Sequence, residues 1–350
     1  MGQSGGRVSQ THRVDVDVAR LADAMRTEGL DVNGVLRLDR IGDGQSNLTY
    51  HAVDERKNSW IVRRPPLGEL LASAHDVVRE YRILKALAGT EVPVPAVHCA
   101  LPPGSVAEVP VVVMAYVAGH VVDGFDGLGN LTPDARRTLT RDLSEVLAQV
   151  HGVVLEEVGL KDLASHAPYA PRQLKRWATQ WEVSRTRDLA PLDELTELLW
   201  RNAPSRTAIA LIHGDFSLRN LITDGNTGKI RAVLDWELST LGDPLADVGT
   251  TLAYWTVSDH GAAAGAVAPV PHEERAEFVR AYLQASRRDG TDIPYWHTLG
   301  LWKLAIIAEG VIRRGQNTPA NAAATGLPTI AEVDRFVAVA RRIARDSGMV

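Results

Sequence analysis

The spacing of apolar residues changes once along the chain of 350 residues, and this change limits the folds that the chain can adopt. In the first third, apolar and polar residues alternate in short runs, which is the pattern of half-buried β-strands. Such runs occur at 35–41, 48–53, 59–65, 94–101 and 109–117. Two helical patterns lie among them, at 17–28 and at about 75–88. This part of the chain therefore predicts a small β-rich lobe.

A glycine-rich segment, 118–130, is followed by a part in which helical spacing dominates. Helices are expected at 133–151, 171–187, 191–202, 244–256, 272–288, 294–314 and 329–346. The exception is 207–235, which has the pattern of a strand, a loop, a short strand, a turn and a strand. We therefore expect an N-terminal lobe (1–117, with 1–14 as a disordered tail), a linker (118–130) and a larger helical lobe (131–350).

The composition is that of an ordinary globular protein, with 45% hydrophobic and 23% charged residues. A net charge of −5 argues against a dedicated nucleic-acid binder, which needs a basic face. Cys99 is the single cysteine, so no internal disulfide can form, and a reducing compartment suits the chain. We find no apolar targeting or membrane segment in the sequence and expect a cytoplasmic location. Nothing in the sequence indicates the oligomeric state.

The polar residues inside the irregular hairpin are the strongest functional signal. Asp215 and Asn220 lie between two apolar runs, and a bare carboxylate is costly to bury there without a partner. Asp235 ends the next apolar strand, so pairing through the turn "DGNTG" places it near Asn220. One carboxylate and one amide oxygen suit Mg²⁺, because this ion takes few ligands from protein and leaves coordination positions for phosphate oxygens and water. Asp215 is then free to act as a base.

The order Asp-x4-Asn followed by Asp is the phosphoryl-transfer arrangement of kinases. Its form here, His213-Gly214-Asp215 through Asn220 and then "VLDWELSTLGDPLADVG", resembles the aminoglycoside phosphotransferase and choline kinase family. It is most similar to the kinase domains that are fused to acyl-CoA dehydrogenases. The resemblance implies an α+β, bilobal protein-kinase-like fold and transfer of the ATP γ-phosphoryl group to a hydroxyl of a small molecule. It implies Asp215 as the base and Asn220 and Asp235 as ligands of Mg²⁺.

The resemblance assigns a phosphate-covering loop to "IGDGQSNLTY", where Gly42 and Gly44 admit the phosphates and Ser46 and Asn47 add polar groups. An ordinary hairpin turn at Asp43-Gly44 explains the same letters.

The third predicted strand carries a cation where kinases have a lysine. Alignment of this strand with the lysine-bearing strand of kinases selects Arg63 as the phosphate contact. Arg64, on the other face of the strand, is the alternative. Glu80, on the following helix, matches the carboxylate that pairs with this cation, although a solvated helix residue is the alternative. The next segment, "MAYVAG", matches the hinge whose backbone holds the adenine edge, at Ala115 and Val117. Because relatives often have glutamate at position 115, GTP remains possible beside ATP.

Further residues of this region are expected to have structural roles. His213 is expected to be a packing residue rather than a base. Asp243 and Pro244 form a helix start, with Asp243 as the N-cap. Asp247, one turn later, resembles the acid that braces the catalytic loop, or it is a simple first-turn acid.

The acceptor is not defined by the sequence. Lys303 and Glu309 on the apolar helix 294–314, and the polar segment 313–326, are candidates for contacts with it. Aminoglycosides, hydroxyacyl-CoA and other hydroxylated metabolites are open alternatives. A catalytically weak nucleotide-binding scaffold is the competing function. A metal-dependent phosphoesterase is disfavoured because no histidine cluster surrounds Asp215.

Overall fold

The computed structural model describes residues 15–42, 47–67, 76–122, 131–205, 208–258, 270–317 and 328–350. The chain divides into two compact units. The first takes the residues up to Lys85 together with Pro95–Tyr116, and the second takes Ala86–Val94 together with the residues from Val117 onward. The predicted Gly44 and Ser46 lie outside the described residues, as do the predicted tail and most of the predicted linker.

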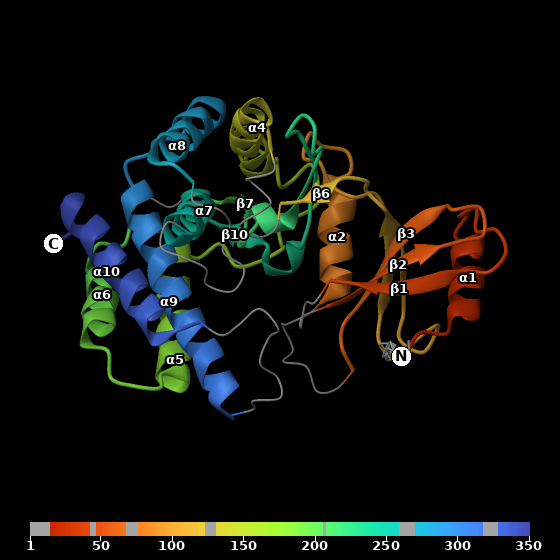
Figure 1. Cartoon of the computed structure of the whole chain (residues 1–350), viewed down its shortest axis with the longest axis horizontal. Helices are drawn as coiled ribbons and strands as arrows, with labels where there is room; N and C mark the ends of the chain where they lie inside the picture. Colours follow the sequence, from red (N-terminus) through yellow and green to blue (C-terminus); the bar gives the residue numbers. More distant parts are fainter. Residues whose placement is uncertain are drawn as a thin grey trace, which may run out of the picture. The chain divides into compact units, whose positions relative to one another are not determined.

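The first unit is built on an antiparallel sheet of five strands in the order β1-β2-β3-β5-β4 (Figure 1). Its strands are β1 (Arg37–Ile41), β2 (Leu48–Val53), β3 (Ser59–Arg64), β4 (Val97–Leu101) and β5 (Val111–Ala115). Burial alternates along β3, as expected for a strand with one face on a core. The same unit contains α1 (Val18–Thr27) and the start of α2 (Val77–Leu87).

Helix α1 closes the core of the first unit. Asp17 caps it, because its Oδ1 accepts the N–H of Arg20 at 3.1 Å. Leu21 and Met25, one turn apart, point to the same side and are fully buried in a cluster with strand residues such as Val62 and Val113. The helix therefore forms because a capped start coincides with an apolar stripe that the sheet can cover.

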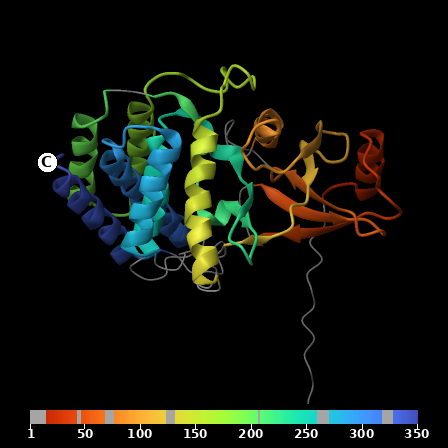
Figure 2. The same ribbon diagram turned by 90° about the horizontal axis from the view of Figure 1, so that it is seen from above.

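The second unit is mostly helical. Its helices are α4 (Pro133–His151), α5 (Tyr169–Ser184), α6 (Ala190–Arg201), α7 (Leu245–Ser258), α8 (His272–Ser286), α9 (Ile293–Asn317) and α10 (Ile330–Asp346). Figure 2 shows α8 (light blue) beside α4 (yellow). Among the described residues, no helix is both long and apolar enough to cross a membrane.

Two small antiparallel sheets carry the irregular hairpin in the second unit. β7 (Ala210–Ile212) pairs with β10 (Thr240–Gly242), and β8 (Leu221–Thr223) pairs with β9 (Ile230–Val233). β6 (His120–Val121) adds to β8. The sequence predicts a linker at 118–130 and no strand at 240–242, which is wrong for β6 and β10. Strands of two or three residues are too short to show an alternating pattern, so their pairing is set by the surrounding structure.

Helices α7 and α9 approach each other backbone to backbone. A Cβ atom on Gly300 would lie 2.9 Å from the carbonyl oxygen of Gly249, and one on Gly249 would lie 2.3 Å from the carbonyl carbon of Trp296. Glycine at both positions is therefore a packing requirement. Trp296 and Trp181 are buried in the core of this unit.

Candidate active site

The loop between β7 and β8 holds the predicted catalytic residues, and glycine is required at its start. Gly214 has φ +85°, and a Cβ there would lie 2.6 Å from the carbonyl oxygen of Leu238. The loop ends in a 3-10 turn, Leu218–Asn220, directly before β8. The sequence Gly-Asp therefore makes a sharp turn that places Asp215 just beyond the end of β7.

His213 fastens this loop from inside the protein. Its side chain is fully buried, with the ring against Phe216 and Trp236. Its Nε2 donates to the carbonyl oxygen of Leu234 at 2.9 Å, and its Nδ1 accepts the N–H of Asp215 at 3.3 Å. Both ring nitrogens are thus used within the fold, which agrees with a packing residue.

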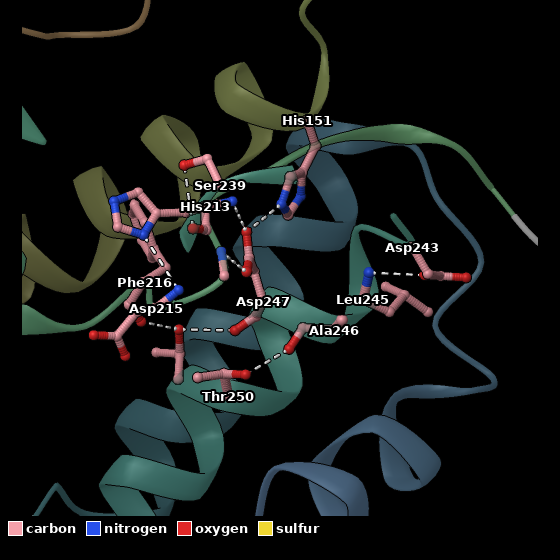
Figure 3. Close-up of polar contacts among 12 residues, drawn as sticks. His151, His213, Asp215, Phe216, Ser239, Asp243, Leu245, Ala246, Asp247 and Thr250 are labelled. Atoms are coloured by element: carbon pink, nitrogen blue, oxygen red, sulfur yellow. Dashed lines mark hydrogen bonds and ion pairs between the residues drawn. The ribbon is translucent and has the colours of Figure 1, made fainter. Parts of the chain in front are cut away.

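Asp247, in the first turn of α7, holds the backbone of the loop (Figure 3). Its carboxylate accepts the N–H of His213 at 2.7 Å and the N–H of Gly214 at 2.8 Å. It also contacts Nε2 of His151 at 3.1 Å. Burial alone would raise the pKa of Asp247, but the hydrogen bonds from His151 and from the loop backbone outweigh burial and lower this pKa.

His151 is itself held by hydrogen bonds at both ring nitrogens. Burial lowers the pKa of His151, so its imidazole is neutral at neutral pH. Its Nδ1 lies 2.9 Å from the hydroxyl of Tyr282. A neutral ring satisfies both partners when Nε2–H donates to Asp247 and Nδ1 accepts from Tyr282, and we assign this tautomer.

Asp215 itself is half-buried and accepts side-chain hydrogen bonds at both oxygens. The hydroxyl of Tyr254, on α7, donates to Oδ1 at 2.7 Å, and Nδ2 of Asn220 donates to Oδ2 at 3.1 Å. Burial, and then the charge of Asp215, raise the pKa of Tyr254 well above its usual value, so this hydroxyl remains a donor. The sequence does not predict this role of Tyr254, because nothing near position 254 resembles a motif.

Asn220 and Asp235 come together at the same end of the β8–β9 hairpin. The register pairs Leu221 with Val233, and the N–H of Leu234 donates to the carbonyl oxygen of Asn220 at 2.7 Å. Asp235 follows with φ 64° and ψ 58°, a left-handed conformation that is uncommon outside glycine. The local pairing that was expected from the turn "DGNTG" is therefore present.

The oxygen donors at this hairpin end fit a magnesium ion that shares its ligands with phosphate. Nδ2 of Asn220 is engaged by Asp215, which leaves its Oδ1 as the atom available to a cation. Within the described chain, no group of three or more His, Cys, Asp or Glu residues could hold a metal ion alone. One amide and one carboxylate oxygen match Mg²⁺, which takes most of its ligands from phosphate and water in such sites.

In the first unit, Arg63 and Glu80 form the ion pair that the sequence suggested. Nη1 of Arg63 lies 2.6 Å from Oε1 of Glu80, and both side chains are largely buried. Arg64 points to the opposite face, where it contacts Tyr50 at 3.3 Å and Asp15 at 3.3 Å. The alternation along β3 thus separates the two arginines and leaves Arg63 as the residue next to the α2 carboxylate.

The remaining predicted nucleotide contacts have simple local settings. Gly42 directly follows β1 with φ +75°, and Asn47 is buried just before β2. Ala115 ends β5, where its N–H donates to the carbonyl oxygen of Ala96 at 2.8 Å. Val117 is the first residue of the second unit after that strand. Their contacts with nucleotide stay predictions from the sequence.

The two candidates on α9 have different surroundings. Glu309 is fully buried, and its Oε1 accepts the N–H of Thr186 at 3.0 Å. It joins α9 to the end of α5, so the expectation that it contacts the acceptor is replaced by a structural role. Lys303 is half-buried, with its Nζ 5.3 Å from the ring centroid of Trp177 on α5.

The sequence profile of the phosphotransferase enzyme family matches residues 37–299, which is most of the chain. The chain therefore belongs to this family, which confirms both the family and the enzyme class, a phosphotransferase, that the sequence predicted.

Two curated relatives are much longer than this chain. Acyl-CoA dehydrogenase family member 10 of Mus musculus is 33% identical over 309 residues, which are 85% of this chain and 28% of that protein. Acyl-CoA dehydrogenase family member 11 of Rattus norvegicus is 32% identical over 300 residues, which are 82% of this chain and 37% of that protein. The chain thus spans roughly a third of the length of these relatives.

Solved structures confirm the α+β, protein-kinase-like fold class. A Ralstonia eutropha protein provisionally assigned as an aminoglycoside phosphotransferase superposes with a TM-score of 0.79 and 27% identity, over 95% of this chain and 98% of that one. The GDP complex of aminoglycoside 2′-phosphotransferase-IIIa superposes with a TM-score of 0.60 and 15% identity, over 94% and 99% of the two chains. The second likeness concerns the fold alone.

Proposed function

We propose that the protein is a small-molecule kinase that transfers the γ-phosphoryl group of ATP to a hydroxyl group, with Mg²⁺ as the metal. The observation that carries this proposal is the set of Asp215, Asn220 and Asp235 at one end of the β8–β9 hairpin. Asp215 is the carboxylate that accepts hydrogen bonds, and Asn220 and Asp235 are the amide and the second carboxylate near it. Phosphoryl transfer uses this arrangement.

In the proposed reaction, Asp215 orients the acceptor hydroxyl and takes its proton. The acceptor oxygen forms a bond to the γ-phosphorus while the bond from that phosphorus to the bridging oxygen of ADP breaks. The products are ADP and a phosphate monoester, and the proton leaves from Asp215 to solvent. Tyr254 and Asn220 keep the carboxylate in one orientation by their hydrogen bonds to its two oxygens.

Asn220 and Asp235 would hold the Mg²⁺, which neutralises charge on the phosphate oxygens when it is bound. Arg63, fixed by Glu80, would contact the phosphates, with Gly42, Gly44, Ser46 and Asn47 covering them. The backbone at Ala115 and Val117 would hold the adenine ring of the nucleotide. GTP is the alternative donor, since the related 2′-phosphotransferase-IIIa was solved with GDP.

The acceptor that we propose is a hydroxylated metabolite such as a hydroxyacyl-CoA or its free acid. The support is the likeness to proteins named as acyl-CoA dehydrogenase family members, whose chemistry acts on acyl chains.

The test is a screen of ATP consumption over hydroxyacyl-CoAs, hydroxy acids, aminoglycosides, choline and sugars, followed by mass detection of the phosphorylated product. Asp215→Ala should retain nucleotide binding and lose about 10²- to 10⁴-fold in turnover, as expected when a general base is removed. Asp235→Ala should lose Mg²⁺-dependent nucleotide binding.

Asp162→Ala is the matched control, because Asp162 is an exposed aspartate of the same unit outside this hairpin. Near-wild-type turnover of Asp215→Ala would reject the assignment of the base. Binding of ATP without transfer to any acceptor and without hydrolysis would favour the nucleotide-binding scaffold instead.

A further inference from the structure

Lys303 lies where three helices of the second unit meet. It follows Gly300, a residue of α9 that packs against Gly249 of α7, by one helical turn. On the α5 side, its Nζ lies over the ring of Trp177. On the α7 side, Ala253 faces Gly300, where an added Cβ would lie 3.0 Å from the Cβ of Ala253. Tyr254, the next residue, donates a hydrogen bond to Asp215. Lys303 thus belongs to the same region as the proposed base.

The ammonium group of Lys303 has no hydrogen bond or ion pair with any residue that the structure describes. Burial lowers the pKa of Lys303, while the negative charges of Asp215 and Asp247 act in the opposite direction. Both acids already have donors of their own, Asp215 from Tyr254 and Asn220 and Asp247 from the loop backbone. Lys303 is therefore a half-buried cation that is electrostatically coupled to the acids of the catalytic region but forms no ion pair with them.

Besides the acids Asp215 and Asp247, two basic side chains lie in this region. Arg176 lies with its guanidinium 5.6 Å from the ring centroid of Trp177, and Arg219 lies 5.9 Å from that of Tyr254. A polycationic acceptor would meet three positive side chains here. An acceptor with a negative group would instead gain a partner for Lys303 as its hydroxyl reaches Asp215.

We propose that Lys303 is a specificity-determining residue that binds an anionic group of the acceptor, with Trp177 holding its side chain in place. The ligand is a hydroxylated small molecule with a carboxylate or a phosphate at one end. This inference rests on the proposed function, since it assumes that Asp215 meets the acceptor hydroxyl.

The test compares three forms of one acceptor, 4-hydroxypentanoate, its methyl ester and its CoA thioester. The free acid has a carboxylate, the ester is neutral, and the thioester has anionic groups only on its phosphates. Lys303→Gln should lower kcat/KM for the anionic form that the enzyme uses by about 10- to 100-fold, mainly through KM, as expected for one charge-assisted contact. It should change the value for the neutral ester less than about twofold, and Lys303→Arg should restore part of the loss.

Lys229→Gln is the control, because Lys229 is an exposed lysine in the turn at the other end of the β8–β9 hairpin. Loss with the free acid alone identifies a carboxylate, and loss with the thioester alone identifies a phosphate. An equal loss with all three compounds, or a raised KM for ATP in place of the acceptor, would overturn the proposal.

A binding measurement separates this inference from the proposed function. Calorimetric titration of the three compounds into wild type and Lys303→Gln does not depend on turnover. Binding of an anionic form that falls at least tenfold in Lys303→Gln supports the inference even where no phosphoryl transfer is detected. Equal binding to both proteins, or no binding of any form to wild type, would overturn it.

Discussion

Asp215 and Asp247 belong to the same catalytic region, but they differ in burial and in the kind of donor that surrounds them. Asp247 is 1% exposed and accepts two backbone N–H groups and a histidine. Asp215 is half-buried and accepts side-chain donors from Tyr254 and Asn220. Asp247 therefore positions the backbone of the loop. Asp215 is itself positioned by neighbouring side chains and remains accessible to a ligand.

This difference predicts that the two aspartates can be separated by experiment. Loss of Asp247 leaves buried backbone donors without an acceptor, which is a cost to folding. Loss of Asp215 removes a half-buried carboxylate whose donors can turn to water, which is a cost to chemistry alone. The following predictions test this division.

The largest effect on stability is expected from Asp247→Ala. Two buried backbone N–H groups and His151 would lose their acceptor, at about 1 to 3 kcal/mol for each unsatisfied group, so the free energy of unfolding should fall by at least about 3 kcal/mol. Urea unfolding followed by circular dichroism measures this value. Asp215→Ala serves as the reference and should change it by less than about 1 kcal/mol. If the two variants are equally stable, the division of roles is wrong.

A smaller effect is expected from Tyr254→Phe, which removes one donor from Asp215 and leaves the ring. The hydrogen bond to a charged carboxylate contributes about 1.5 kcal/mol, so kcat should fall by roughly tenfold. Nucleotide affinity and the unfolding midpoint should stay close to wild type. Steady-state kinetics and nucleotide titration give the two values. An unchanged kcat would show that Asn220 alone orients the base.

The third prediction concerns pH and His151. Because burial lowers the pKa of His151 in the folded protein, protonation near its ordinary pKa of 6.5 favours the unfolded chain. The contribution of neutral His151 is therefore complete above about pH 6.5 and declines as the pH falls below it. His151→Gln retains a donor toward Asp247 but has no such titration. Between pH 7.5 and pH 5.5, the free energy of unfolding should fall less in this variant than in wild type. An equal fall in both proteins would contradict the assignment of a neutral buried ring.

Much of the fold and one part of the site follow from local sequence. The strand at 48–53 and the helix at 133–151 have the predicted bounds, because their apolar spacing continues over their whole length. The meeting of Asn220 with Asp235 was also predictable, since a short turn joins the two strands and fixes their register.

The partners of these residues depend on contacts far apart in the chain. Tyr254 reaches Asp215 across 39 positions, and His151 reaches Asp247 across 96. Such pairs are set by how helices pack, and a single sequence has no local pattern that records them. The same reason applies to β6 and β10, which are too short to be recognised before their partners are in place.

By itself, the sequence determined the succession of elements and the chemistry of the loop His213–Asn220, because both depend on residues that are near neighbours. The tertiary structure decided which groups surround that loop: the buried acid that holds its backbone, the tyrosine that orients Asp215, and the lysine of α9 beside Trp177. The physical reason is that burial and electrostatic coupling arise between helices, after the chain has folded, and not within any one segment.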